Sequence, residues 1–508
     1  MALLGQLIKS ALDLGNTLTQ DSNPPQQRQE QQLRQLLQKA QGTSFGLYYQ
    51  FSELLDSSDI RKAYQETVPI FQYAAMNERW WQQQQNVASV TWPGKPDYFA
   101  LSSGTTGKKS KHIPVTSDML QSFRKVGIGQ ATSLANFNLP KELFETEVLM
   151  LGSSANLQSN KNHLEGEISG INTSNLPPWF GNFYRPGLEI ASIDNWDSRV
   201  EEIARQAPHW NIGAIAGIPS WVLKMLQSII EYHQLEHIHQ IWPNLQLYLS
   251  GGVAFEPYRS SLNNLLANPL TYLDTYLASE GFFAYTARPG SMDMRLAIDA
   301  DIYYEFIPFD EQGFDELGKL LKDPTVLTIE ELEEGKDYAL VISTPAGAWR
   351  YMIGDTIKFT NLEELELVIS GRTKYFLNVV GSQLSEEKLN TAIQEIAQST
   401  KLNISEYSVA ALKNADGEFY HQWVLGVEET NQPPKDLAQQ LDQALKERNK
   451  NYRVAREKAL KNIAVELVSK EVLYDWLEQK KKKGGQIKLP KVSKPEMMED
   501  LLAFLKTV

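Results

Sequence analysis

The chain has 508 residues, of which 42% are hydrophobic and 10% are aromatic. That length and content suffice for a large core and for two or three domains, and they exclude a generally disordered protein. The formal net charge of −13 at pH 7 gives no electrostatic footprint for nucleic acid or an anionic membrane. The sequence has no cysteine, which excludes disulfides, a cysteine nucleophile and thiolate metal sites.

The N-terminal region is predicted to be helical. Residues 1–15 are apolar but lack a basic leader, and polar residues interrupt them at helical spacing, which favours an amphipathic helix over a signal peptide. Residues 26–41 predict a second helix with Leu33, Leu36 and Leu37 on one face and the glutamines on a solvated face. Because no run of about 18 apolar residues occurs, we expect no membrane partner and a cytoplasmic protein.

The segment from Phe99 to Thr116 predicts an apolar strand that runs into a turn rich in glycine and hydroxyl groups. Gly104 and Gly107 allow backbone N–H groups to face an anion. Hydroxyl and cationic side chains are plentiful in this turn: Ser102, Ser103, Thr105, Thr106, Lys108, Lys109 and Lys111. This is not a Walker A motif, because only two residues separate the glycines and no hydroxyl residue directly follows Lys108. The segment is either a nucleotide-phosphate loop or a polar turn of small residues.

The next stretch predicts a helix, a strand and a long loop. Thr116 or Ser117 is a candidate N-cap for a helix that ends at about Leu134. Residues 147–152 predict a buried strand. Residues 153–186 are rich in glycine, asparagine, proline and aromatic residues, so we expect a loop that either walls a pocket for an organic acid or forms a surface lid.

Strands and helices then alternate, which predicts a parallel sheet wound with helices. The predicted strands are 213–217, 245–249 and 270–277, and the helices between them are 221–232 and 256–266. Ligands bind at the carboxyl ends of such strands. We therefore expect residues 250–253 and 276–281 to face the same crevice as the loop at 102–111.

Two carboxylates stand where apolar strands end. Glu280 is a candidate to hold Mg²⁺ between itself and nucleotide phosphates, and a surface cap or ion pair is its alternative. Asp355, after Gly354, could accept two hydrogen bonds from the cis hydroxyls of a ribose. Gly-Asp is also common in hairpin turns, so a purely structural role stays open.

The C-terminal part predicts antiparallel strands followed by a compact α+β unit. Strand patterns occur at 303–306, 338–342, 365–369 and 463–468, with two further runs around 414–417, and helix patterns occur at 388–396, 435–448 and 472–479. The lysines at 480–483 predict a solvated run. Lys488 differs, because it lies between Ile487 and the apolar Leu489–Pro490, and it is a candidate positioned cation.

These patterns together predict an α/β protein with two domains. The large N-terminal domain, residues 1–375, would contain helix-flanked, mostly parallel sheets plus antiparallel strands. The smaller α+β domain would comprise residues 376–508.

The loop at 102–108 and five later segments, in their order along the chain, resemble the Gretchen Hagen-type acyl acid amido synthetases. This is the auxin-responsive family, with bacterial relatives, in the adenylate-forming superfamily. Beside the loop at 102–108, the segments that carry the resemblance are Thr275 to Glu280, Tyr304 to Phe306, Arg350 to Asp355, Gly381 to Glu386 and Gly485 to Pro490. The resemblance runs from about Phe45 to Lys491. Leu277, at a position that is usually small, and Met352, where the plant members carry arginine, depart from the family pattern.

The resemblance implies that the large domain binds ATP with Mg²⁺ and an organic acid, while the small domain is a mobile lid. It implies a phosphate cradle of Ser102, Ser103, Thr105, Thr106 and Gly107, an adenine wall of Tyr276, Ala278 and Ser279 with Gly252 and Val253 opposite, and Arg372 near the ribose or phosphate. Asp355 would hold the ribose. Glu280 would place Mg²⁺, and Lys488 would swing in as the second catalytic residue.

The activity implied by the resemblance is ATP-dependent amide formation. A carboxylic acid is activated as an acyl-adenylate, pyrophosphate is released, and the acyl group passes to an amine, usually an amino acid, with release of AMP. An acyl-CoA ligase and a non-catalytic acyl-acid or nucleotide-binding protein are the alternatives. The sequence specifies neither the acid, nor the amine, nor the oligomeric state.

Overall fold

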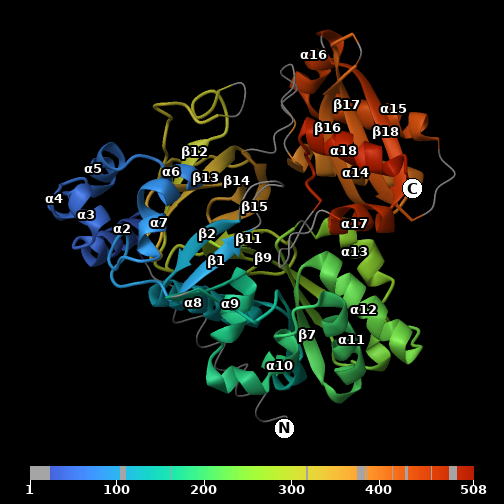
Figure 1. Ribbon diagram of the computed structural model, residues 1–508, viewed down its shortest axis with the longest axis horizontal. Coiled ribbons are helices and arrows are strands. Elements are labelled where there is room, and N and C mark those ends of the chain that lie inside the picture. The colour runs from blue at the N-terminus through green and yellow to red at the C-terminus, as the bar shows by residue number, and fades with distance from the viewer. Residues whose placement is uncertain are drawn as a thin grey trace.

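The computed structural model describes residues 23–102, 110–160, 162–253, 255–315, 319–373, 384, 386–414, 416–428, 433–458, 460–479 and 489–507. The described residues form a large body with an eleven-stranded and a four-stranded sheet, and a smaller C-terminal body with a three-stranded sheet. The C-terminal body, orange to red in Figure 1, lies beside the large body. This arrangement confirms the predicted α/β fold with a large N-terminal and a smaller C-terminal part.

The eleven-stranded sheet joins a parallel half to an antiparallel half. Its strands, in spatial order, are β12 (Tyr303–Pro308), β13 (Asp337–Ser343), β14 (Tyr351–Asn361), β15 (Glu366–Arg372), β11 (Met294–Leu296), β10 (Gly281–Tyr285), β9 (Thr271–Ala278), β8 (Leu247–Gly251), β7 (Ile212–Gly217), β3 (Glu147–Leu151) and β6 (Tyr184–Arg185). The strands from β9 to β6 pair in parallel, and those from β12 to β9 pair antiparallel. The predicted alternation of strands and helices between residues 213 and 277 is confirmed.

Helices cover the parallel half because each has an apolar stripe to bury. They are α10 (Leu188–Ala191), α11 (Trp196–Gln206), α12 (Pro219–His233) and α13 (Glu256–Asn263), and the green helices α11 and α12 lie beside β7 in Figure 1. Val222 and Leu226 of α12 are buried with Ile215 of β7 in one cluster. α8 (Ser117–Ser133) begins as predicted, with the Thr116 hydroxyl accepting from the Met119 backbone N–H.

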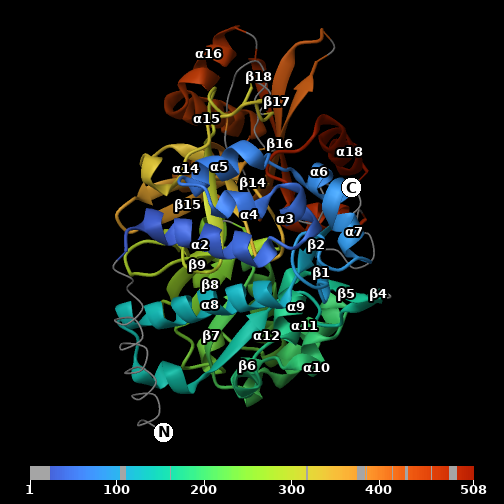
Figure 2. The ribbon, with the colours of Figure 1, turned by 90° about the vertical axis from the view of Figure 1, so that its left-hand side faces the viewer.

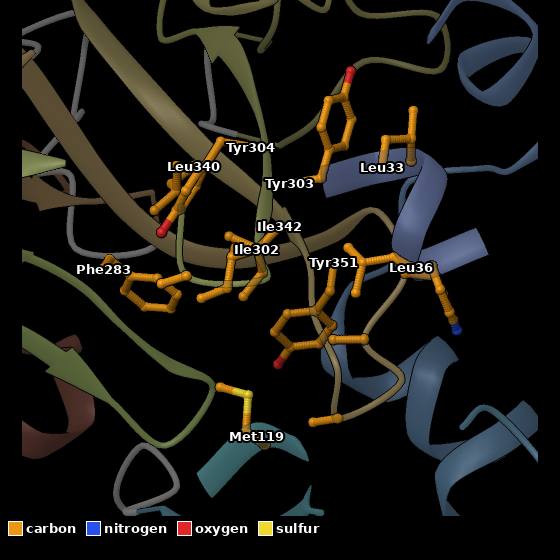
Figure 3. Packing of buried hydrophobic residues seen from close by; sticks show 14 of the residues in the cluster. Leu33, Leu36, Met119, Phe283, Ile302, Tyr303, Tyr304, Leu340, Ile342 and Tyr351 are labelled. Atoms are coloured by element: carbon orange, nitrogen blue, oxygen red, sulfur yellow. The ribbon is translucent and has the colours of Figure 1, made fainter. Parts of the chain in front are cut away.

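The N-terminal helices cover the antiparallel half. They are α2 (Pro25–Ala40), α3 (Ser44–Tyr48), α4 (Phe51–Leu55), α5 (Ile60–Thr67), α6 (Tyr73–Met76), a π-helical turn (Asn77–Trp81) and α7 (Gln82–Gln84), drawn in blue in Figure 2. Leu33 and Leu36 of α2 lie toward Tyr303 and Tyr351 in the core (Figure 3). The expectation that the glutamines of α2 are all solvated is wrong for Gln29. Its buried amide donates to the Ile298 and Ile302 carbonyls, because those carbonyls need partners.

A four-stranded sheet carries the predicted phosphate segment. Its order is β2 (Lys111–Val115), β1 (Tyr98–Ser102), β5 (His163–Gly166) and β4 (Gln158–Asn160), with α9 (Ile168–Ser174) following. Residues 153–186 were expected to form a loop, and this is wrong over much of the stretch. β5 pairs in parallel with β1, so a partner distant in sequence supplies the hydrogen bonds that local composition does not predict. Short 3₁₀ helices occur at Leu134–Asn136, Lys141–Glu145, Pro178–Asn182, Ala207–His209, Ile238–Gln240 and Ile329–Glu331.

The C-terminal body is the predicted α+β unit. Its elements are α14 (Glu386–Thr400), β16 (Ile404–Lys413), β17 (Phe419–Val427), α15 (Pro434–Arg448), α16 (Lys450–Lys458), β18 (Leu460–Ser469), α17 (Lys470–Gln479) and α18 (Pro495–Leu505). β16 and β17 form an antiparallel hairpin, and β18 returns parallel to β17 after the two helices. Both faces of this sheet bury apolar clusters. The predicted boundary at 375/376 lies outside the described residues.

In the described part of the chain, none of the helices combines the length and the hydrophobicity that crossing a bilayer requires.

Candidate nucleotide site

Gly354 and Asp355 lie inside β14, so the hairpin-turn alternative is wrong. Gly354 has φ of +99°, and the pairing of β14 with β13 shifts between Ala339 and Val341. A bulge of this kind bends the strand and redirects the following side chain, and the positive φ favours glycine. Asp355 lies opposite Arg372 in the ladder between β14 and β15.

Two side chains hold the Asp355 carboxylate in place. The Tyr276 hydroxyl donates to Asp355 Oδ2 at 2.8 Å, and Arg372 Nε lies 3.0 Å from Oδ1. The Asp355 side chain is 9% exposed, whereas that of Arg372 is 56% exposed. A carboxylate has about four acceptor positions, so capacity remains for two hydroxyl donors. Asp355 therefore keeps acceptor positions that the cis diol of a ribose could use.

Glu280 lies in the turn between β9 and β10, where it is 6% exposed. The Tyr351 hydroxyl donates to Glu280 Oε1 at 3.3 Å. Burial raises the pKa of Glu280, the nearby Lys111 ammonium counteracts that rise, and Asp355 adds to it. Lys111 also lies over the Tyr73 ring, 5.3 Å from its centroid. A buried carboxylate next to a cation at the start of β2 places Glu280 close to the predicted phosphate segment.

The ends of β8 and β9 lie side by side, as expected. Thr275 Oγ1 donates to the Ser250 carbonyl at 2.7 Å, and a Cβ on Gly251 would lie 2.4 Å from that hydroxyl oxygen. Of the predicted adenine-wall residues, Gly252 and Val253 follow β8, Tyr276 and Ala278 lie in β9, and Ser279 begins the next turn. Tyr276 is 3% exposed, and its ring packs against Phe283 at 5.0 Å. Its visible role is to hold Asp355.

Part of the predicted site lies outside the described residues. These positions are Ser103, Thr105, Thr106, Gly107 and Lys488. Ser102 is described, at the end of β1, and it pairs with Lys111 in the β1–β2 ladder. The structure therefore fixes the two ends of the phosphate segment, Ser102 and Lys111, next to each other in the β1–β2 ladder.

Sequence reasoning missed three ionisable side chains near this region. Asp274 lies two residues before Tyr276 in β9, and burial raises its pKa to about 7. The pKa of Glu386, at the start of α14, is raised, because burial outweighs the opposing effect of the Lys491 and Arg372 cations. Lys491 forms an ion pair with Glu406 at 3.2 Å. The sequence does not mark Asp274 as functional, because it is a single polar residue within an apolar strand. Glu386 and Lys491 approach the site only through tertiary packing.

The donor set fits magnesium bound together with a nucleotide. Among the described residues, no group of three or more His, Cys, Asp or Glu side chains could hold a metal ion by itself. Mg²⁺ usually takes one or two carboxylates and completes its shell with water and substrate phosphates. Glu280 is a buried carboxylate that could serve as such a ligand.

Solved structures define the class of this fold. A structure described as "AtGH3.15 acyl acid amido synthetase in complex with 2,4-DB" has a TM-score of 0.75 and 15% identity, covering 94% of this chain and 93% of that chain. One of a 2-hydroxyisobutyryl-CoA ligase in the postadenylation state has a TM-score of 0.55 and 10% identity, covering 94% and 91%. The fold is that of the adenylate-forming ligases.

The chain belongs to the GH3 family, because family models cover more than half of it. The N-terminal domain matches residues 15–185, the central domain 296–366 and the C-terminal domain 387–496. It is 26% identical over 208 residues to the indole-3-acetic acid-amido synthetase GH3.2 of Arabidopsis thaliana, covering 38% of this chain and 37% of that protein. It is 28% identical over 225 residues to a jasmonoyl–L-amino acid synthetase, GH3.5, of Oryza sativa subsp. japonica, covering 41% and 38%. The alignments therefore span well under half the length of these two relatives.

Proposed function

We propose that the protein is an ATP-dependent acyl acid amido synthetase. It activates a carboxylic acid as an acyl-adenylate and transfers the acyl group to an amine, for which an amino acid is the best candidate. The observation that carries the proposal is the Asp355 carboxylate, held by Tyr276 and Arg372 beside Glu280 in a chain of the GH3 family.

The first step overcomes the poor reactivity of a carboxylate. A carboxylate oxygen of the acid attacks the α-phosphorus of ATP, a new O–P bond forms, the bond to the β-phosphate breaks and pyrophosphate leaves. In the proposal, Asp355 accepts hydrogen bonds from the ribose and Ser102, Ser103, Thr105, Thr106 and Gly107 surround the phosphates. Bound at Glu280, Mg²⁺ would neutralise phosphate charge. Lys488 would stabilise charge that develops at the α-phosphate.

The second step forms the amide. The neutral amine attacks the acyl carbon, the bond to the AMP oxygen breaks, and the nitrogen loses a proton. Because the acceptor must reach a carbon that lies close to the phosphate during the first step, the C-terminal domain would move between the two steps. Gly252, Val253, Ala278 and Ser279 would hold the adenine through both.

The deciding experiment measures pyrophosphate release with Mg-ATP across indolic, benzoic, jasmonate-like and fatty acids. Each acid is tested alone, with mixed amino acids and with CoA. Release stimulated by amino acids, with an amide detected by mass spectrometry, is the expected result. Stimulation by CoA alone would assign the protein to the acyl-CoA ligases, a class with the same fold.

Replacing Lys488 tests its catalytic role. Lys488→Ala should lower pyrophosphate release by about 10²-fold or more while the Kd for Mg-ATP changes little, because the lysine acts on charge that appears in the transition state. Lys483→Ala, in the neighbouring lysine run, is the matched control. Unchanged release in the Lys488 variant would remove this residue from the mechanism.

A further inference from the structure

A single buried carboxylate joins the two bodies of the molecule. Glu406, near the start of β16, is 7% exposed. It accepts a hydrogen bond from the hydroxyl of Tyr258, which lies on α13 of the large body. From the C-terminal body it accepts from the Tyr474 hydroxyl at 3.3 Å and from Lys491 Nζ at 3.2 Å. Donors from both bodies therefore converge on one carboxylate.

The surrounding geometry directs Glu406 toward α13. The pairing of β16 with β17 shifts between Ile404 and Glu406, and such a bulge changes the direction of the side chain that follows it. A second hydrogen bond crosses the same boundary, from Asn403 Nδ2 to Ser261 Oγ at 2.9 Å. A buried carboxylate is costly unless its acceptor positions are filled, so the Tyr258 hydroxyl has an energetic role beyond simple contact.

Lys491 connects the same carboxylate to the segment that follows Lys488. Its ammonium group lies 4.6 Å from the centroid of the Tyr407 ring. Its carbonyl accepts from the Val409 N–H at 2.9 Å, and the Ser408 hydroxyl donates to the Pro490 carbonyl at 2.8 Å. Residues 489–493 are thus fastened along β16, the strand that carries Glu406.

Charges of alternating sign continue from Lys491 to the candidate ribose site. Glu386, at the start of α14, packs against β15 beside Arg372, because a Cβ added to Gly371 would lie 3.2 Å from the Glu386 Cβ. Burial raises the pKa of this carboxylate, and the Lys491 and Arg372 charges both lower it against that rise. Arg372 in turn pairs with Asp355 at 3.0 Å. The series Asp355, Arg372, Glu386, Lys491 and Glu406 therefore runs from β14 across the junction and ends at α13.

We propose that Glu406 is a positioning residue that docks the C-terminal domain on α13 and at the same time seats residues 489–493. Through Lys491, Glu386 and Arg372 this docking is coupled to occupancy of Asp355 by a nucleotide. The coupling rests on the proposed function, because it takes Asp355 as the ribose site. The docking role does not.

The docking role is tested without any acyl substrate. Because the chain has no cysteine, Gln227→Cys on α12 and Gln439→Cys on α15 provide two unique sites for a fluorescent donor and acceptor. Both positions are exposed, one on each body. Single-molecule energy transfer between them reports the fraction of molecules with the domains docked as in this structure.

Tyr258→Phe should lower the ratio of docked to undocked molecules about tenfold, because it removes one hydrogen bond to a buried charge. Tyr474→Phe is the matched control. It removes a hydroxyl from the same carboxylate but within the C-terminal body, so it should leave the ratio within about twofold of the unsubstituted protein. Equal ratios in all three proteins, or equal losses in both variants, would overturn the docking role.

The coupling is tested by adding Mg-ATP alone to the same labelled proteins. Mg-ATP should change the docked fraction in the unsubstituted protein, and Glu406→Gln should abolish that change while still binding the nucleotide. An identical response in Glu406→Gln would overturn the coupling. If the proposed function were wrong and Mg-ATP did not bind at all, calorimetry would show it directly, and the effect of Tyr258→Phe would remain.

Discussion

Two ion pairs, one just before β14 and one inside it, differ in what surrounds them. Arg350, just before the strand, pairs with Glu305 at 3.0 Å, with side chains 4% and 1% exposed. Its guanidinium also donates to the carbonyls of Gln65 and Val68 at 2.7 Å each. Asp355, five residues later, pairs with the half-exposed Arg372. The segment 350–355 therefore contains Arg350, a charge that stabilises the fold, and Asp355, a charge that remains available to a ligand.

The largest effect is expected at the buried pair of Arg350 and Glu305. Arg350→Met should lower the free energy of unfolding by about 3–5 kcal/mol, because it leaves the Glu305 carboxylate buried without a cation. Urea denaturation followed by tryptophan fluorescence measures the loss. Arg350→Met combined with Glu305→Gln should recover part of it, and a loss in the single variant no larger than that of a surface substitution would contradict the comparison.

A change in the partly exposed pair of Asp355 and Arg372 should affect binding more than folding. Asp355→Asn should raise the Kd for Mg-ATP about tenfold or more, because a neutral amide is a weaker acceptor for the ribose hydroxyls than a carboxylate. Isothermal calorimetry measures the affinity. Asp337→Asn, on the neighbouring β13, is the control and should leave the Kd unchanged. An unchanged Kd in Asp355→Asn would leave the Gly354–Asp355 bulge a structural feature only.

The pH dependence of nucleotide binding sharpens the comparison further. The pKa of Glu280 is raised, chiefly by burial, and Mg²⁺ requires the ionised carboxylate. Affinity for Mg-ATP should therefore rise as pH rises through this pKa, while the contribution of Glu280 to folding stability is present at low pH and is lost over the same range. Titrations from pH 4.5, the ordinary pKa of a glutamate, upward should show a steeper affinity change than in Glu280→Gln. Parallel curves would contradict the magnesium role.

The smallest effect on stability is expected from Arg372. Arg372→Gln should change the free energy of unfolding by at most about 1 kcal/mol, because its side chain is 56% exposed and water screens the pair with Asp355. Thermal unfolding of the Arg372→Gln and Arg350→Met variants, measured side by side, compares the two losses of stability. A loss as large as that of Arg350→Met would show that the two ion pairs contribute equally to stability.

The sequence predicted the parts of the fold that depend on local pattern. Strands and helices between residues 213 and 277 have strong periodicity and clear caps, and their order specifies a parallel sheet. Residues 153–186 lack such a pattern. Their strand character comes from pairing with β1, and Gln29 is buried because of carbonyls about 270 positions away.

The features of the candidate site also divide into those that a local sequence pattern predicts and those that depend on tertiary contacts. Glu280 and Asp355 could be predicted because each follows an apolar run, and Asp355 was singled out despite its resemblance to a turn. The hydrogen bond from Tyr276 to Asp355 spans 79 positions, and the bulge at Gly354 depends on the register of β13. Neither follows from spacing along the chain. The roles of all the predicted site residues stay predictions, Glu280 and Asp355 included.

The contact between α2 and β12 has a consequence for synthesis of the protein. The Gln29 side chain accepts from the Tyr304 backbone N–H, 275 positions later, and Leu33 and Leu37 are fully buried beneath the same core. A ribosome that adds about 5–20 residues per second needs roughly 15–55 seconds to pass from one to the other. Throughout that interval α2 can pack only against its early neighbours α3, α4 and α5, and its contact with β12 is missing. The first helix of the described chain therefore completes its burial only after β12 has been made.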